Sequence, residues 1–78
     1  MIKKGKYRHY KGGMYEVIGV GCHSENVKEK FVVYKSLYDH PDFKKGQIWV
    51  RPIDIFYDKV VIDNKEMERF VYVDEFKI

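Results

Sequence analysis

The fold of this chain is decided by residues 48–56, which read IWVRPIDIF. The stretch holds the only Trp of the chain and its densest apolar cluster, with one Arg inside it. As a strand, its first half places Trp49, which we expect to be largely buried, on the same face as Arg51. Pro52 cannot donate a ladder hydrogen bond, so we expect the strand to end there. Residues 53–56 then predict a single helical turn that returns apolar side chains to the core.

Segments rich in β-forming residues lie on both sides of this stretch, separated by close turn signals. Three lie upstream, at residues 5–10, 14–22 and 31–38, and two lie downstream, at residues 59–62 and 67–70. The glycine pair at 12–13 and the polar run at 63–66 favour tight hairpin turns. No window shows sustained helical periodicity. The pattern predicts an all-β protein, and the helical turn before a late strand favours a small SH3-like barrel of five to six short antiparallel strands.

Length and composition limit the kind of protein this can be. We expect one domain, residues 1–78, and a domain of this size buries only roughly 60% of the surface that its unfolded chain exposes. The 17% aromatic content provides large side chains for the core. A single Cys excludes a disulfide within the chain and favours a reducing compartment. With no apolar run of a signal peptide or of the ~20 residues of a membrane span, we expect a cytoplasmic protein with no membrane partner.

The charge of +3 is unevenly distributed along the chain. Residues 1–11 carry five basic side chains and no acid, whereas residues 52–78 carry seven acids against four bases. The basic start, with Tyr7 and Tyr10 in it, could contact phosphates and stack on bases, so a nucleic-acid-binding barrel is one alternative function. The acidic C-terminal third argues against a surface for polyphosphates. We therefore expect any nucleic-acid binding to be weak. The alternative interpretation is that the basic arm serves solubility alone.

A set of polar and aromatic side chains could meet at one mouth of such a barrel. The set is Arg8, His9, His23, Ser24, Glu25, Tyr34, Trp49 and Arg51. Arg presents a planar fork to carboxylate or phosphate, and Tyr and Trp present flat faces, so the set predicts a site for a small anionic ligand or peptide. The alternative is that Arg51 is structural, paired with Glu16 or Glu25, with its stem on Trp49. A peptide could also use an aromatic groove that includes Tyr38.

The anion site carries a specific geometric expectation. Arg51 ends one strand and His23 ends another, and we expect their side-chain tips to lie within ~8 Å, near enough to share one anion. Arg8 is a secondary member of the site. The glycine turn should place Arg8 opposite residues near Ile18, so that it reaches His23 only if the glycine-containing strand 14–22 bends back.

The sequence offers little for catalysis or for a metal. Adjacent loop residues such as His23-Ser24-Glu25 cannot easily align as nucleophile, base and orienting group, and they are better suited to bonding the local backbone. A metal would have to use Cys22 and the histidines, but no Cys-x-x-Cys or His-x-x-x-His spacing occurs. We therefore expect a binding module rather than an enzyme, with no cofactor and no metal.

A family resemblance covers nearly the whole chain. It rests on Gly5-Lys6-Tyr7-Arg8-His9-Tyr10-Lys11-Gly12, Tyr15-Glu16-Val17, His23-Ser24-Glu25, Val32-Val33-Tyr34, Leu37-Tyr38, Trp49-Val50-Arg51-Pro52, Phe56 and Arg69-Phe70. In this order these residues resemble the DUF1653 family, small bacterial proteins or domains of unknown function. The resemblance implies an SH3-like fold and no established chemistry. Two segments differ from the family pattern. Asp63-Asn64-Lys65 replaces the more usual Asp-Gly-Lys. The loop at 39–46 is longer and more charged than in the family, so no functional role is transferred to residues 39–46.

Overall fold

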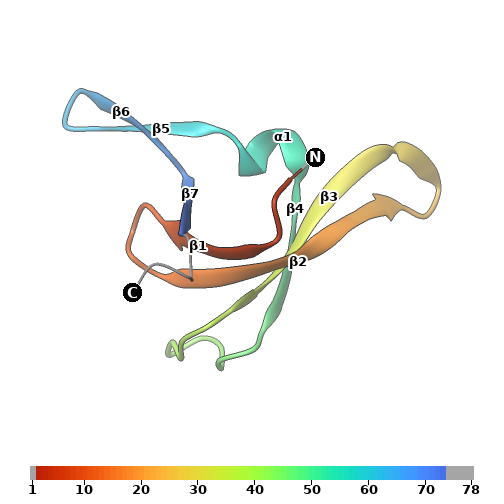
Figure 1. Ribbon diagram of the computed structural model, residues 1–78, viewed down its shortest axis with the longest axis horizontal. Helices are drawn as coiled ribbons and strands as arrows, with labels where there is room; N and C mark the ends of the chain where they lie inside the picture. The colour runs from red at the N-terminus through yellow and green to blue at the C-terminus, as the bar shows by residue number, and fades with distance from the viewer. Residues whose placement is uncertain (1, 74–78) are drawn as a thin grey trace.

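The computed structural model describes residues 2–73, which are almost entirely β-structure (Figure 1). The strands are β1 Gly5–His9, β2 Met14–His23, β3 Asn26–Ser36, β4 Ile48–Pro52, β5 Lys59–Ile62, β6 Lys65–Glu68 and β7 Phe70–Val73. One helical turn, α1 Ile53–Phe56, directly follows β4. The predicted all-β class and the helical turn are confirmed. The described residues form seven strands rather than five to six. The final β-segment is interrupted at Arg69, which separates β6 from β7.

Five strands form one antiparallel sheet in the order β4-β3-β2-β1-β7, and β5 pairs separately with β6. Within residues 2–73 no ladder joins the edge strands β4 and β7, so the sheet does not close into a full barrel. Pro52 ends β4 after five residues, which leaves no strand to reach β7. Side chains span the opening instead. The rings of Phe56 from α1 and Phe70 from β7 stack with centroids 4.3 Å apart.

The first hairpin has a different register from the one that the sequence predicts. Arg8 lies opposite Met14 rather than near Ile18. The reason is that the turn includes residues 10 and 11 as well as the glycine pair, since the Gly12 N–H donates to the His9 carbonyl at 2.7 Å. The long strand β2 then bends where its register with β3 shifts at Ile18, as a bulge typically causes.

The β2–β3 hairpin is longer than the sequence pattern indicates. β2 continues to His23 and β3 already begins at Asn26, so only Ser24 and Glu25 form the turn. Residues 26–30, predicted to precede the strand, are exposed strand residues. The end of this hairpin projects away from the rest of the sheet (Figure 1). Cross-strand backbone bonds rather than core burial hold this arm, which is why its polar sequence gives no strand signal.

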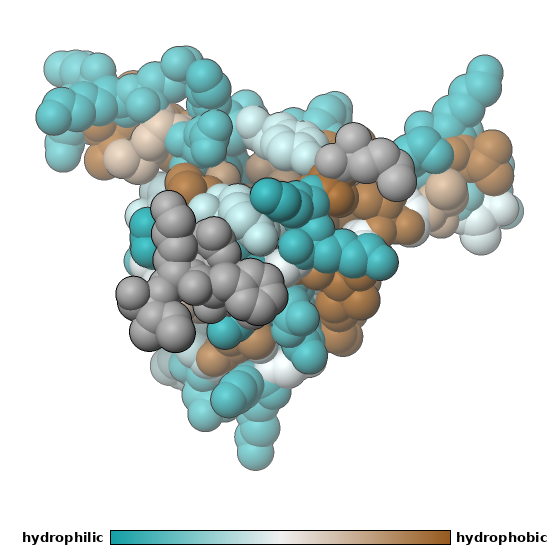
Figure 2. All heavy atoms as spheres, viewed as in Figure 1, coloured by the Kyte–Doolittle hydropathy of each residue, from teal (hydrophilic) through white to brown (hydrophobic). Residues whose placement is uncertain are grey.

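The β5–β6 hairpin confirms the predicted turn. Asp63 and Asn64 both have positive φ, at 52° and 64°, which is the requirement of a two-residue type I′ turn. The second strand of the pair is Lys65–Glu68 rather than residues 67–70. On the face shown in Figure 2, hydrophilic side chains cover most of this hairpin, at the upper left. No helix within residues 2–73 has the length and apolarity needed to cross a membrane.

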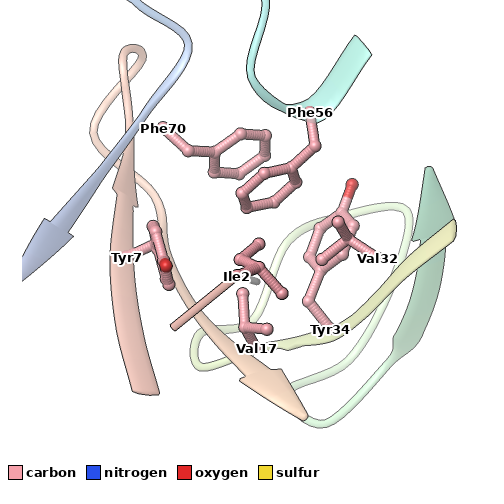
Figure 3. Packing of buried hydrophobic residues seen from close by; sticks show 7 residues of the cluster. All are labelled: Ile2, Tyr7, Val17, Val32, Tyr34, Phe56 and Phe70. Atoms are coloured by element: carbon pink, nitrogen blue, oxygen red, sulfur yellow. The ribbon is translucent and has the colours of Figure 1, made fainter. Parts of the chain in front are cut away.

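The core lies between the curved sheet and α1 (Figure 3). Its buried hydrophobic members are Ile2, Tyr7, Val17, Val32, Tyr34, Phe56 and Phe70. Five strands or turns contribute to it, and Ile2 joins from the segment before β1. Trp49 packs against this cluster with its Nε1 buried, and part of the ring remains exposed because the residue lies near the start of the edge strand β4.

Candidate functional site

Arg51 is held against the core on the inner face of β4. It pairs in register with the fully buried Val32 of β3 and is itself half-buried. Its Nε donates to the Tyr34 hydroxyl at 3.2 Å, and its Cζ lies 5.8 Å from the centroid of the Phe70 ring. These contacts fix the stem and one edge of the guanidinium. Within residues 2–73 no carboxylate pairs with Arg51, so its terminal nitrogens remain available as donors.

The two acids that could have made Arg51 structural lie elsewhere. Glu16 forms an ion pair with Lys35, with a nitrogen–oxygen distance of 3.6 Å. Glu25 lies in the exposed turn of the β2–β3 hairpin. The guanidinium of Arg51 lies over an aromatic ring, and that ring is Phe70 rather than the predicted Trp49. The structure therefore does not form the ion pair that the sequence offered as an alternative.

His9 lies close to the same guanidinium. Its ring centroid is 4.9 Å from that of Phe70. Burial lowers the pKa of His9, and repulsion from Arg51, Arg69 and Lys11 lowers it further. The imidazole is therefore held neutral. Its Nδ1 accepts the Lys11 backbone N–H at 3.2 Å, so the neutral ring carries its proton on Nε2 and can donate there.

The aromatic surroundings of this site are locked by hydrogen bonding and close packing. The hydroxyls of Tyr15 and Tyr38 lie 2.7 Å apart. Burial, and then the hydrogen bond with Tyr38, raises the pKa of Tyr15, so this phenol stays protonated. The ring of Tyr38 lies over Gly13, where an added Cβ would be 2.6 Å from the Tyr38 hydroxyl. A side chain at residue 13 would therefore displace the Tyr38 ring, whereas the positive φ of the turn lies at Gly12.

Arg69 adds a second guanidinium at this end of the sheet. Its Nη2 lies 3.7 Å from Asp58 Oδ2, and its Cζ lies 6.0 Å from the centroid of the Tyr10 ring. The Nε of Arg69 is buried and has no hydrogen-bond partner in the described part of the chain. We call Arg51, His9, Tyr34 and Phe70 the Arg51 cluster, and Arg69 and Lys11 contribute positive potential to it.

The structure does not bring His23 to the Arg51 cluster. Val20, Val32 and Arg51 lie side by side across β2, β3 and β4. His23 follows Val20 by three residues on β2, two strands away from β4, which separates the backbones by roughly 14 Å at standard strand spacings. Its ring contacts Phe31, at a centroid distance of 6.4 Å, and Phe31 directly precedes the inward-facing Val32, so it points to the other face. His23 and Arg51 thus leave opposite faces of the sheet.

Of the other residues predicted for the anion site, some lie near Arg51 and some lie far from it. Tyr34 contacts Arg51 directly, and Trp49 shares its face, in register with Tyr34. Arg8 is exposed and lies on the outer face of β1, because its neighbour Tyr7 is buried. Ser24 and Glu25 remain at the hairpin tip. Phe70 was absent from the predicted set because nothing in the sequence indicates that β7 lies beside β1.

The three histidines each make the same kind of local hydrogen bond. The Nδ1 atoms of His9, His23 and His40 each accept the backbone N–H of the residue two positions later, at 3.1 to 3.2 Å. Each histidine therefore stabilises a turn. No three His, Cys, Asp or Glu side chains within residues 2–73 are placed to hold a metal ion. Cys22 is exposed, with its Sγ 3.7 Å from Lys30 Nζ.

Known proteins resemble this chain over most of its length. Residues 5–72 match the model of a family described as "Protein of unknown function (DUF1653)". A crystal structure of a protein belonging to that family, from Bordetella bronchiseptica, is 33% identical in sequence with a TM-score of 0.77. The match covers 92% of this chain and 87% of that chain. None of the curated proteins matches this chain.

Proposed function

This chain belongs to the DUF1653 family, whose function is unknown, and we propose that it is a non-enzymatic binding module for an anionic group on a small ligand or a peptide. One observation carries the proposal. Arg51 is half-buried and fixed by Tyr34 and Phe70, yet within residues 2–73 no acid neutralises it. A guanidinium held in this way lacks the carboxylate that a structural role would supply.

The chemistry of the Arg51 cluster suits an anion. The two terminal nitrogens of a guanidinium form parallel, charge-assisted hydrogen bonds with a carboxylate or a phosphate. Partial burial strengthens these bonds, because the effective dielectric constant falls away from bulk water. The neutral His9 adds an Nε2 donor beside Arg51, and the nearby Lys11 and Arg69 attract negative charge. Fixed donors also lose little rotamer entropy on binding.

A peptide could bind along the free edge of β4, next to this site. β4 is an edge strand of the five-stranded sheet, so one side of its backbone is not used by β3. An extended peptide can add itself to such an edge through main-chain hydrogen bonds, and alternate side chains then face the sheet. On this arrangement an Asp or Glu of the peptide reaches Arg51 on the inner face. Ile48 and Val50, which are 49% and 64% exposed, offer apolar contact on the outer face.

The test is an NMR titration of the full chain with acetate, inorganic phosphate and an acidic peptide. We expect saturable shifts at Arg51 and His9, and loss of those shifts in Arg51→Gln. Arg8→Gln is the matched control, because Arg8 is an exposed arginine on the opposite face. The proposal fails if neither anion nor peptide shifts the cluster, or if Arg8→Gln has the same effect as Arg51→Gln.

Two further measurements separate this proposal from its competitors. If Arg51→Gln lowers the free energy of unfolding of the ligand-free protein by several kcal/mol, about the cost of breaking a buried pair, Arg51 is structural. Fluorescence anisotropy with labelled single-stranded and duplex oligonucleotides, at ~0.15 M salt, tests the nucleic-acid alternative. Sub-micromolar binding that depends on sequence would replace the proposed function.

A further inference from the structure

A second candidate site lies on the other aromatic surface of the fold, where a cavity of about 190 Å³ opens between α1, β1, β6 and β7. Its lining residues, which we call the aromatic pocket, are Tyr7, Phe56, Tyr57, Glu68, Phe70 and Tyr72. We propose that the aromatic pocket binds a methylated ammonium group. Arg51 does not line this cavity, and the two sites share only Phe70, so this inference goes beyond the anion site and does not depend on it.

Most neighbouring rings in the walls of the aromatic pocket meet at steep angles, whereas Phe56 and Phe70 are stacked on each other. Tyr7 and Phe56 have centroids 5.5 Å apart and planes at 78°. Tyr57 lies at 90° to Phe56, and Tyr72 lies at 75° to Tyr7. Tyr7, Phe56 and Phe70 are at most 7% exposed, so the core fixes their positions (Figure 3). The tyrosines Tyr7, Tyr57 and Tyr72 thus reach one small space from different directions, which suits a quaternary ammonium because the face of an aromatic ring attracts a cation.

Glu68 makes the aromatic pocket selective for positive charge. It is the one charged residue in the described lining, at the end of β6. Its cross-strand neighbour Lys59 forms its ion pair with Glu66 instead, at 3.6 Å. Within residues 2–73 Glu68 has no hydrogen bond or ion pair, so its carboxylate is available to a ligand. An anion would meet this carboxylate and the negative ring faces, and is excluded.

The tyrosines of the aromatic pocket already show the relevant interaction. The ammonium of Lys3 lies over the Tyr72 ring, with Nζ 4.5 Å from the centroid, and the Lys3 carbonyl accepts the Tyr7 hydroxyl at 2.7 Å. Burial raises the pKa of Tyr7, and the neighbouring Tyr57 and Tyr72 raise it further. The Tyr7 phenol therefore stays uncharged and does not attract a metal.

The size of the cavity and the nature of its walls select the ligand. A volume of about 190 Å³ is smaller than the ~300–1,000 Å³ of pockets for whole drug-sized molecules, so a head group rather than a complete ligand is enclosed. A primary ammonium is strongly hydrated and costs more to bring against apolar rings. Methyl groups spread the charge and contact the rings directly. The carrier is either a small molecule such as choline or a methylated lysine side chain.

An NMR titration of the full chain with choline tests the proposal, with 3,3-dimethyl-1-butanol as the neutral probe of the same shape. We expect saturable shifts at Tyr57, Phe70 and Tyr72 with choline and none with the alcohol. Glu68→Gln should weaken choline binding about threefold to fivefold, the range of a partly exposed ion pair. Tyr57→Leu should weaken it about fivefold through the lost cation–π contact. Both residues are exposed, so both variants should fold.

Glu66→Gln is the matched control, because Glu66 lies two residues before Glu68 on the same strand and is already paired with Lys59. It should leave the affinity for choline unchanged. A trimethyl-lysine peptide and the same peptide without methylation show which molecule carries the ammonium group. Tighter binding of the methylated peptide than of choline would identify a methylated lysine side chain. Equal binding would identify a free small molecule. The inference is overturned if the alcohol binds as well as choline, if choline produces no saturable shifts in the pocket, or if Glu66→Gln weakens binding as much as Glu68→Gln.

Discussion

Arg51 and His23 are both polar side chains near the end of a strand, and the structure positions them in opposite ways. Arg51 is half-buried, bonded to the Tyr34 hydroxyl and set over the Phe70 ring, so residues from two other strands fix it. His23 lies at the end of a projecting hairpin, where its Nδ1 accepts the backbone N–H of Glu25 at 3.1 Å. A contact with the core fixes where a donor points, whereas a local bond fixes only the turn that contains it.

This difference divides the molecule into two regions with different energetics. The residues that support Arg51 touch the aromatic core, so substituting them should change the free energy of unfolding as well as ligand binding, whereas Arg51→Gln should mainly change binding. In the β2–β3 arm beyond residue 21 most side chains are exposed, and substitutions should change little. Four substitutions, taken from the largest expected effect to the smallest, test this division.

Phe56→Ala should have the largest effect. Phe56 is 2% exposed and stacks on Phe70 across the open side of the sheet. Removing a buried Phe costs about 3–5 kcal/mol, a large part of the total stability of a small domain. Urea unfolding followed by Trp49 fluorescence measures the loss. Ile55→Ala, in the same helical turn but at a residue that is 43% exposed, is the control and should cost much less. Equal losses would mean that the stack does not hold the two edges together.

Tyr34→Phe should have an intermediate effect. The change keeps the buried ring but removes the hydroxyl that accepts the bond from Arg51 Nε. A hydrogen bond from a charged donor contributes about 1.5–3 kcal/mol. We expect a stability loss toward the low end of that range and weaker anion binding, because the guanidinium is freed to move. Tyr10→Phe is the control. If Tyr34→Phe leaves both quantities unchanged, Arg51 is positioned by other contacts.

The pH dependence of stability should show the burial of His9. Burial and the nearby cations lower the pKa of His9 from its ordinary 6.5, so below pH ~6.5 the unfolded chain binds a proton that the folded chain does not. The contribution of His9 to stability is complete above that pH and is lost as the pH falls through the folded-state value. Urea unfolding at pH 7.5 and pH 5.5 should show a decline that is smaller in His9→Gln. A variant with the unchanged decline would place the imidazole in solvent.

His23→Ala should have the smallest effect. Its ring contacts only Phe31 among the described aromatic side chains, and its hydrogen bond lies within the turn. Surface changes of this kind stay within about 0.5 kcal/mol. The melting temperature should move little, and acetate should shift Arg51 as in the unmodified protein. A loss of anion binding in His23→Ala would show that the two residues act at one site despite their separation.

Several features of this fold could be predicted from short stretches of sequence. The helical turn at 53–56 follows from Pro52, which cannot continue the ladder of a strand. The turn between β5 and β6 follows from Asp63 and Asn64, which tolerate positive φ. The shared face of Trp49 and Arg51 follows from strand alternation alone. Each of these depends on neighbouring residues, whose conformational preferences act wherever the rest of the chain lies.

The remaining features depend on residues that are far apart in the chain. The bulge at Ile18, the early start of β3 at Asn26 and the open edge between β4 and β7 are set by pairing between strands, for which the sequence carries no local signal. The same holds for both sites. Arg51 meets Phe70 because the sheet curves until its edge strands β4 and β7 approach each other, and Glu68 comes to line a cavity with Tyr7 because the following strand β7 pairs with β1. The sequence by itself determined the elements and the residue types available for binding, and the tertiary structure decided which of them share a site, because only packing brings distant side chains into contact.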